Sequence, residues 1–234
     1  MLLAKLKRRA PWNRVKGLDL YESLVAIREP NGSSAEAYRA LRTNLLYAFV
    51  DSSPRVIVIT SPGDGEGKTT TCANLGVTLA QVNGKTLIVD CDLRKPNLHM
   101  MFGVRNLYGF TNVLRGEHSL QEACHTPFPG LNLLTAGPIP PDPTELLSSR
   151  RLAGFIDQAH QQYEYMLIDA PPVRFVSDPV IIARHGDGVL LVFDAQSTRK
   201  GWVRQSVRSL ENVGARVLGV VMNNAQAPTL DYYG

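Results

Sequence analysis

Residues 61–70, with the sequence SPGDGEGKTT, are the most informative part of this chain. It follows a short run of β-branched residues at 55–60 and opens a helical pattern at 68–82. Glycines at this spacing let successive backbone N–H groups point at one place, and the start of the helix adds partial positive charge. The stretch therefore predicts a phosphate-binding loop between a strand and a helix.

The residue types in this loop have separate expected roles. We expect the ammonium of Lys68 to reach the β- and γ-phosphates of a nucleotide, and the Thr69 hydroxyl to bind Mg²⁺. The common pattern has glycine at position 62, where this chain has Pro62. A chance glycine-rich turn before Lys-Thr is the alternative, which the flanking strand and helix disfavour. The predicted nucleotide-binding residues of the loop are Gly63, Asp64, Gly65, Glu66, Gly67, Lys68, Thr69 and Thr70.

Three aspartates stand where predicted strands end. Asp90 and Asp92 lie at the end of the second apolar run, and Asp169 lies at the end of a later one. Residues two apart in an extended chain point to the same side, so Asp90 and Asp92 are expected to face the phosphates together. Strand-end aspartates are also common as helix caps and turn formers, which explains one of them more easily than three. With the loop they predict Mg-nucleotide binding, with Thr69, Asp92 and Asp169 around the metal.

Short apolar runs alternate with longer helical patterns along the chain. Several runs are continuous in Val, Ile and Leu, as expected for parallel strands that are covered on both faces. This alternation predicts an α/β fold, a doubly wound, mostly parallel sheet with helices on both faces and ligands at the carboxyl ends of its strands. The expected strands are 55–60, 86–90, 131–135, 165–169, 189–193 and 216–222, and the expected helices lie near 68–82, 144–162, 178–184 and 199–213.

The composition of the 234 residues is that of an ordinary globular chain, with 44% hydrophobic and 20% charged residues, which excludes general disorder. No apolar run approaches the ~20 residues that a membrane span needs, and no secretory signal pattern is visible. The three cysteines lack CxxC spacing, which argues against a disulfide scaffold or a zinc site. A reduced, cytoplasmic protein is the resulting expectation.

The positive charge of the chain is concentrated at one end. Residues 1–16 hold six basic and no acidic side chains, whereas the rest holds 19 basic and 21 acidic ones. A near-neutral body disfavours nucleic-acid binding, while the basic tail suits peripheral contact with anionic lipid at the inner face of the cell membrane. A solvated terminus is the alternative. The expected organisation is a basic extension at 1–32, a nucleotide-binding domain at 33–224 and a short tail at 225–234.

Further motifs give the chain a resemblance to a known family. They are Asp90-x-Asp92-x-Arg94, Asp169 followed by Ala-Pro-Pro, a Glu-x-x-Arg-x-x-Arg pattern at 36–42, a Pro-rich stretch at 137–147 and the tyrosine pair Tyr232-Tyr233. From residue 34 to residue 224 the chain resembles the bacterial tyrosine kinases (BY-kinases), which are P-loop proteins and the cytoplasmic kinases of capsule and exopolysaccharide export systems. Two tyrosines are fewer than the terminal clusters of that family usually hold.

The resemblance implies a protein-tyrosine autokinase that uses ATP and Mg²⁺, with Lys68, Asp90 and Asp92 as catalytic residues. It also implies that Tyr232 and Tyr233 are phosphoacceptors. A tyrosine hydroxyl has a pKa of about 10, so it arrives protonated and benefits from a nearby carboxylate. Asp90 is our candidate for that base, and metal binding is its alternative role.

Two further residues, Asn223 and Arg94, have expected roles at the site. Asn223, after the last predicted strand, resembles the asparagine that reads adenine in related ATPases, and a strand-end turn residue is the alternative. Arg94 is expected to contact phosphate or an acidic neighbour.

The Glu-x-x-Arg-x-x-Arg pattern, expected on a helix at 33–50, is the oligomerisation motif of the family. At ~100° per residue, Glu36, Arg39 and Arg42 form one stripe, while Leu41, Leu45 and Ala48 lie on the roughly opposite face. The apolar face is expected to pack on the domain and the stripe to project outward. An ordinary solvated helix is the alternative. The resemblance implies rings in which the tail of one subunit enters the site of the next.

The resemblance also implies partners, namely a transmembrane polysaccharide co-polymerase as activator and a tyrosine phosphatase. Two other functions stay open. A nucleotide-switched ATPase of the partition or septum-positioning type has a similar fold, but such proteins usually carry a Lys-Gly-Gly arrangement where this chain has Ser61-Pro62-Gly63. A non-enzymatic, nucleotide-bound scaffold of a polysaccharide exporter is the other alternative.

Overall fold

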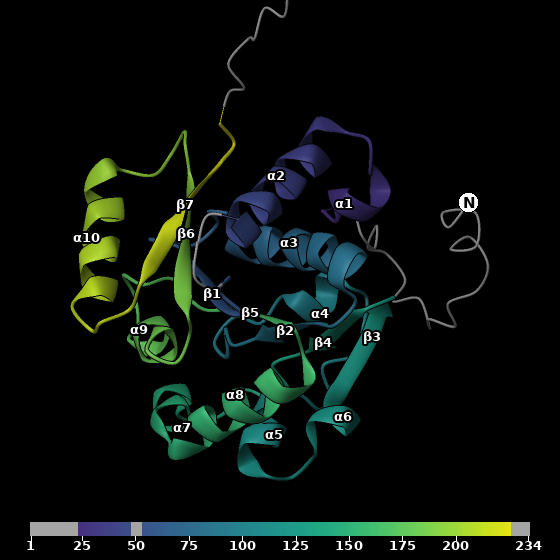
Figure 1. Cartoon of the computed structure of the whole chain (residues 1–234). Coiled ribbons are helices and arrows are strands. Elements are labelled where there is room, and N and C mark those ends of the chain that lie inside the picture. The colour runs from purple at the N-terminus through teal and green to yellow at the C-terminus, as the bar shows by residue number, and fades with distance from the viewer. Residues whose placement is uncertain (1–22, 48–52, 226–234) are drawn as a thin grey trace, which may run out of the picture.

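The computed structural model describes residues 23–47 and 53–225, and a seven-stranded sheet runs through the middle of them (Figure 1). The strand order is β3-β4-β2-β5-β1-β6-β7. All neighbouring strands are parallel except β3 and β4, which are antiparallel at one edge. The predicted fold class is therefore confirmed. The strands are β1 (Val56–Thr60), β2 (Thr86–Asp90), β3 (Cys124–Phe128), β4 (Leu131–Leu134), β5 (Tyr165–Asp169), β6 (Gly188–Asp194) and β7 (Val217–Asn223).

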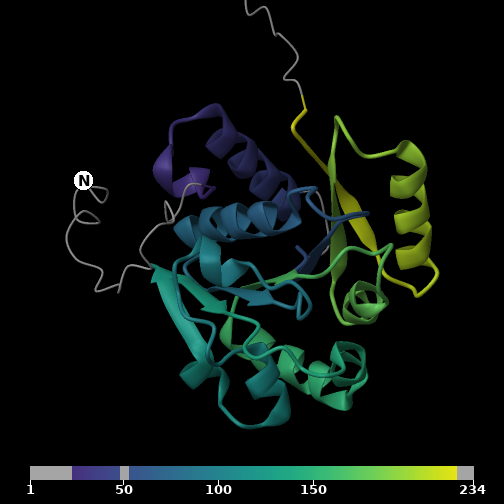
Figure 2. The ribbon, with the colours of Figure 1, turned by 180° about the vertical axis from the view of Figure 1, so that it is seen from behind.

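Helices cover both faces of this sheet, and Figure 2 shows the same layers from behind. The first four helices lie on one face and the last six on the other, as their buried side chains show. The helices are α1 (Val25–Arg28), α2 (Ser33–Tyr47), α3 (Lys68–Asn83), α4 (Leu98–Met101), α5 (Phe110–Arg115), α6 (Leu120–Ala123), α7 (Pro143–Ser148), α8 (Arg150–Gln162), α9 (Asp178–Ala183) and α10 (Lys200–Glu211).

The central strand β1 shows how the sequence builds two cores. Its residues are all buried, and successive side chains of a strand point to opposite faces. Val56 and Val58 pack with the helices α5 to α10, whereas Ile57 and Ile59 pack with α3 and its neighbours. Each fully buried side chain of this size contributes about 1.5–3 kcal/mol to the free energy of unfolding.

The parallel arrangement places the carboxyl ends of β1, β2 and β5 side by side. β2 and β5 are in register so that Asp90 pairs with Asp169, and Ile59 of β1 pairs with Asp169 on the other side. The loop at 61–67 leaves the same edge, because it directly follows β1 and leads into α3. Residues that are far apart in the sequence meet there.

Several elements differ from the sequence-based expectation. The helix expected near 144–162 is two helices, because Ser149 takes an extended conformation between α7 and α8. The edge strand β3 was not expected, since it follows α6 directly and contains Pro127, a residue that weakens any strand signal. The helices α1, α4, α5 and α6 are four to six residues long, too short for a helical repeat to be read from the sequence.

The segment before α2 packs onto α3. Leu24 is fully buried, and the side chain of Asn74 accepts a hydrogen bond from the Ala26 N–H (3.0 Å) and donates one to the Ser23 carbonyl (2.8 Å). Residues 23–32, expected within the basic extension, are therefore part of the folded domain. The basic residues at 1–16 and the tail tyrosines lie outside the described residues. None of the described helices combines the length and the apolar character needed to cross a membrane.

Candidate active site

The loop at 61–67 has the strand-loop-helix setting that its sequence predicted. Gly65 and Gly67 have positive φ angles of 76° and 89°, a backbone conformation that residues other than glycine rarely adopt. α3 begins directly after Gly67. A Cβ atom at Gly67 would lie 2.1 Å from the amide nitrogen of Asn223, so this glycine also allows β7 to approach the loop.

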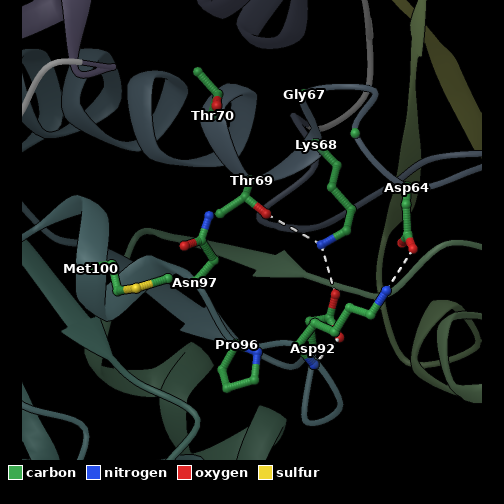
Figure 3. Close-up of a pocket in the computed structure, with 11 residues that line it drawn as sticks. Asp64, Gly67, Lys68, Thr69, Thr70, Asp92, Pro96, Asn97 and Met100 are labelled. Atoms are coloured by element: carbon green, nitrogen blue, oxygen red, sulfur yellow. Dashed lines mark hydrogen bonds and ion pairs between the residues drawn. The ribbon is translucent and has the colours of Figure 1, made fainter.

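The ammonium of Lys68, at the start of α3, lies beside the Asp92 carboxylate and the Thr69 hydroxyl (Figure 3). Its Nζ atom is 2.9 Å from Oδ2 of Asp92 and 3.4 Å from Oδ1 of Asp169. Burial alone would lower the pKa of Lys68, but the charges of Asp169 and Asp92 outweigh burial and raise it above its ordinary value. Lys68 is therefore a permanent cation, held where the phosphates of a nucleotide would arrive.

Asp169 contacts both Lys68 and Thr69. Its carboxylate accepts a hydrogen bond of 2.7 Å from the Thr69 hydroxyl, which in turn lies 3.2 Å from the Lys68 ammonium. The residue is almost completely buried. Burial raises the pKa of Asp169, whereas the Lys68 ammonium and the Thr69 hydroxyl act in the opposite direction.

Asp90 is placed differently from Asp92. Its carboxylate is fully buried and accepts hydrogen bonds from the backbone N–H groups of Asp92 (3.3 Å), Asn97 (3.1 Å) and Leu98 (3.1 Å). Burial, followed by the charge of Asp169, raises the pKa of Asp90. The carboxylate thus holds the turn after β2 and is not among the residues that line the cavity.

An open cavity of about 510 Å³ lies over the loop and the end of β2. Six of the nine predicted nucleotide-binding residues line it, and Gly63, Glu66 and Asn223 do not. Asp92 also lines the cavity. Four residues that come after the Asp-x-Asp-x-Arg motif line it too, and they were not expected at the site. The lining residues are Asp64, Gly65, Gly67, Lys68, Thr69, Thr70, Asp92, Lys95, Pro96, Asn97 and Met100.

The donors at this site suit Mg²⁺ better than a metal that needs a protein cage. Within 23–47 and 53–225, no group of three or more His, Cys, Asp or Glu side chains is arranged to hold a metal ion by itself. Mg²⁺ prefers oxygen and binds through one or two carboxylates, with waters and phosphates completing its shell. Thr69, Asp92 and Asp169 offer such oxygens, and the Lys68 ammonium between the two carboxylates shows that the place accepts a cation.

Asn223 contacts the phosphate loop from the end of β7. Its side-chain amide lies 3.4 Å from the Glu66 carbonyl, with which it forms a long hydrogen bond. The Glu66 side chain turns into the protein, where burial raises its pKa and its Oε2 has no hydrogen-bond partner among the described residues. A loop contact at this strand end could not be read from the sequence, because it depends on β7 lying beside β6.

Two basic residues after β2 form ion pairs with aspartates. Arg94, for which phosphate or an acidic neighbour was expected, donates to Asp178 at 2.8 Å and to Thr144 at 3.0 Å. Lys95 forms an ion pair with Asp64 at 2.7 Å. This pair connects the phosphate loop to the turn after β2 at the mouth of the cavity.

The motif at 36–42 lies on α2, and its residues contact the same chain. Arg39 donates to Glu36 at 2.7 Å and to the Pro30 carbonyl at 2.7 Å. Arg42 donates to the Thr78 carbonyl of α3 at 2.9 Å. The expected outward stripe is therefore incomplete, because Arg42 faces α3 and is half-buried while Glu36 remains exposed.

Known proteins are similar to this sequence along most of its length. Residues 54–217 match the model of a family described as an AAA domain. The chain is 36% identical over 220 residues to the tyrosine-protein kinase YwqD of Bacillus subtilis, covering 94% of this chain and 93% of that protein. It is 34% identical to the tyrosine-protein kinase CpsD of Streptococcus agalactiae, covering 84% and 85%. It is 32% identical to Wzc of Salmonella typhimurium, of which it spans 31%.

Solved structures agree with these relatives. The fold superposes with a TM-score of 0.84 on the kinase domain of the Escherichia coli tyrosine kinase ETK, at 30% identity over 98% of this chain and 90% of that one. It superposes equally well, at 0.84, on the chimerical protein CapA2B2, at 37% identity over 88% and 91%. The sheet with its flanking helices and the glycine-rich loop at 61–67 together place the chain among the P-loop nucleotide-binding proteins. The chain belongs to the bacterial tyrosine-protein kinase family, and it is a tyrosine kinase.

Proposed function

We propose that this kinase phosphorylates Tyr232 and Tyr233 of a neighbouring copy in a ring-shaped oligomer, and that this autophosphorylation regulates capsular or exopolysaccharide polymerisation and export. The observation that carries the chemistry is the Lys68 ammonium near both Asp92 and Asp169, on the wall of the open cavity over the phosphate loop. Phosphoryl transfer needs mostly positioning and neutralisation of charge, which this cluster supplies.

Each residue of the cluster has a proposed role. Lys68 and the backbone N–H groups of the loop bind the β- and γ-phosphates of ATP. Thr69, Asp92 and Asp169 hold Mg²⁺, which supplies positive charge at the transferred phosphoryl group when bound. Asn223 binds adenine from the end of β7, where its amide already contacts the loop.

Two carboxylates are available for the proton of the tyrosine hydroxyl. Asp92 lines the cavity, whereas Asp90 lies behind it with a raised pKa and with its oxygens bonded to backbone N–H groups. The position of Asp92 at the cavity favours it as the Mg²⁺ ligand proposed above, with its oxygens also accepting hydrogen bonds from Lys68 and from the Lys95 N–H. Asp90 is proposed to act on the hydroxyl proton or to keep the turn after β2 in place.

The oligomer and its partners complete the proposal. We propose that Glu36, Arg39 and Arg42 contribute to the ring contact from α2. A transmembrane polysaccharide co-polymerase activates the kinase, a tyrosine phosphatase resets it, and the basic residues at 1–16 help to hold it at the inner face of the cell membrane. Flotation of the chain with anionic vesicles that carry such a partner tests the membrane contact, which is refuted if the chain never floats.

The kinase proposal is tested by mass spectrometry of phosphosites after incubation with Mg-ATP. We expect phosphate on Tyr232 or Tyr233 in the unchanged protein and none in Lys68→Met. Lys85→Met is the matched control, because Lys85 is exposed and lies at the amino end of β2, away from the nucleotide site. The tail of this variant should be phosphorylated normally. Unmodified tyrosines in a protein that binds and hydrolyses ATP would contradict the proposal.

A nucleotide-switched ATPase is the second candidate. The fold superposes with a TM-score of 0.62 on the septum site-determining protein MinD complexed with Mg-ADP from Pyrococcus horikoshii, at 29% identity over 72% of this chain and 70% of that one. Hydrolysis without tyrosine modification, in the experiment above, would favour this candidate.

A further inference from the structure

The outer side of α10 carries a row of basic side chains. Lys200, Arg204 and Arg208 are exposed and stand four residues apart, so they follow one side of the helix over about 12 Å. The opposite side is occupied, because Val207 and Leu210 pack against the core. The helix itself lies on the outside of the sheet, beside β7 (Figure 1). The basic row therefore points away from the protein.

None of the residues that the structure describes neutralises this row. The three side chains form no ion pair within 23–47 and 53–225, and the one acid of α10 is Glu211 at its last position. The aspartates nearest in sequence are engaged elsewhere. Asp178 accepts from Arg94. Asp187 and Asp194 accept from backbone N–H groups. The row thus presents its full positive charge to solvent.

Aromatic side chains lie at the amino end of the row. The guanidinium carbon of Arg174 is 4.0 Å from the centre of the Trp202 ring and 6.0 Å from that of Phe175. The guanidinium carbon of Arg199 is 5.2 Å from the centre of the Trp202 ring. Phe175 is 60% exposed. This end of α10 therefore combines further cations with an exposed aromatic ring.

A surface of anionic phospholipid offers partners for both kinds of side chain. Its headgroups attract cations, and the headgroup level of a membrane accepts aromatic rings. The apolar side of α10 is packed on the core, so the contact stays at the headgroups, where each cation should raise the partition coefficient about fivefold. Duplex nucleic acid would attract the same cations through its phosphates, but it offers nothing apolar to cover Phe175. The combination favours lipid.

We propose that the basic row of α10, formed by Lys200, Arg204 and Arg208, binds the surface of an anionic phospholipid membrane. This surface is separate from the basic residues at 1–16, whose lipid contact is proposed above, and it does not depend on the kinase reaction. None of the three residues lines the nucleotide cavity, so lipid binding and nucleotide binding can be measured independently.

Co-sedimentation of the full chain with vesicles of phosphatidylcholine, with and without phosphatidylserine, tests the proposal. The unchanged chain should bind the vesicles that contain phosphatidylserine, and less tightly as salt is added. The triple variant Lys200→Gln, Arg204→Gln and Arg208→Gln should lower the partition coefficient about 100-fold, and Arg204→Gln alone about fivefold. The Kd for ADP should change less than twofold in each variant, which shows that the protein remains folded.

The matched control removes the same charge from other elements. It carries Lys85→Gln, Arg105→Gln and Arg150→Gln, three exposed residues outside α10, and its partition coefficient should fall less than about fivefold. All variants are also made in a second background in which the six basic residues at 1–16 are replaced by glutamine. Binding should be weaker there, with the difference between the α10 variant and the control retained.

The outcomes separate α10 from the basic residues at 1–16 and from net charge. A loss specific to the α10 variant in both backgrounds supports the proposal. Equal losses in the α10 variant and the control overturn it, because binding would then follow net charge alone. Loss only with the substitutions at 1–16 overturns it and leaves the contact of that segment standing. Binding to duplex DNA but to neither kind of vesicle, abolished in the α10 variant, overturns it in favour of nucleic acid. None of these results bears on phosphorylation, which the phosphosite experiment tests separately.

Discussion

The carboxylate of Asp169 accepts a hydrogen bond of 2.7 Å from the hydroxyl of Thr69, a residue 100 positions earlier in the chain. The contact joins the end of β5 to the first turn of α3. Because both groups are nearly inaccessible to solvent, removal of one partner leaves the other unsatisfied, which is costly inside a protein. The nucleotide site is thus connected to the centre of the sheet.

Thr69→Val should therefore affect both stability and metal use. We expect the free energy of unfolding to fall by about 1–3 kcal/mol, because the Asp169 carboxylate loses a buried donor. Higher Mg²⁺ concentrations should be needed for ATP binding. Urea unfolding and Mg²⁺ titrations measure the two effects. Thr69→Ser keeps the hydroxyl and should restore both, and a Ser variant as defective as Val would speak against the hydroxyl as the cause.

Gly67→Ala should abolish nucleotide binding. The alanine would have to adopt a φ of +89°, and its Cβ would meet the amide of Asn223 at 2.1 Å. The loop and the end of β7 would have to move apart. Gly154→Ala is a suitable control, since a Cβ there meets nothing within 4 Å in α8 and should stabilise the helix by about 0.5–1 kcal/mol. Calorimetric titration with ADP decides, and normal affinity in Gly67→Ala would refute this account of the loop.

Asp90 should give the nucleotide-free protein a distinctive pH dependence. Its pKa is raised to about 8 in the folded protein, above an unfolded value near 4. The folded state therefore keeps a proton that the unfolded state releases, so this contribution to stability is full below about pH 4 and is lost as the pH rises through about 8. The slope is at most about 1.4 kcal/mol per pH unit.

Asp90→Asn should remove this contribution, so its free energy of unfolding should fall less steeply between pH 5 and pH 8. Urea unfolding at several pH values measures it. Asp157→Asn, on the exposed side of α8, serves as the control and should keep the slope of the unchanged protein. The same slope in Asp90→Asn and in the unchanged protein would show that another group causes the pH dependence.

Arg42 should matter for folding as well as for assembly. Arg42→Ala removes the bond to the Thr78 carbonyl and should lower the free energy of unfolding by about 1 kcal/mol. Glu36→Ala removes only an exposed ion pair and should cost about 0.2–0.5 kcal/mol. Both variants should reduce oligomer mass in light scattering. Unchanged oligomers in both would remove α2 from the proposed ring contact.

The sequence alone supports much of the site, because its decisive residues are local. Gly65 and Gly67 lie in one loop and Lys68 begins the helix that follows it, a setting that can be read from the flanking apolar runs. Asp169 and Asp92 were expected at strand ends, where the parallel sheet brings them to Lys68. These predictions needed the order of elements but no packing detail.

Other features depend on contacts between distant segments. The hydrogen bonds that the Asp90 carboxylate accepts from backbone N–H groups could not be predicted from the sequence. They form only because the turn at 91–98 folds back over the end of β2. The same holds for Arg42, whose partner is a helix carbonyl of α3. Lys95 was missed although it follows the Asp-x-Asp-x-Arg motif directly, since its ion pair with Asp64 forms only once the two loops meet.

The most direct test of transfer between copies mixes two variants, neither of which can phosphorylate its own tail. One protein carries Lys68→Met with an intact tail, and the other carries Tyr232→Phe and Tyr233→Phe with an intact site. With Mg-ATP, the account predicts phosphate on Tyr232 or Tyr233 of the Lys68→Met chain only when the two proteins are mixed. If that chain stays unmodified in the mixture while the unchanged protein phosphorylates itself, transfer between copies is contradicted.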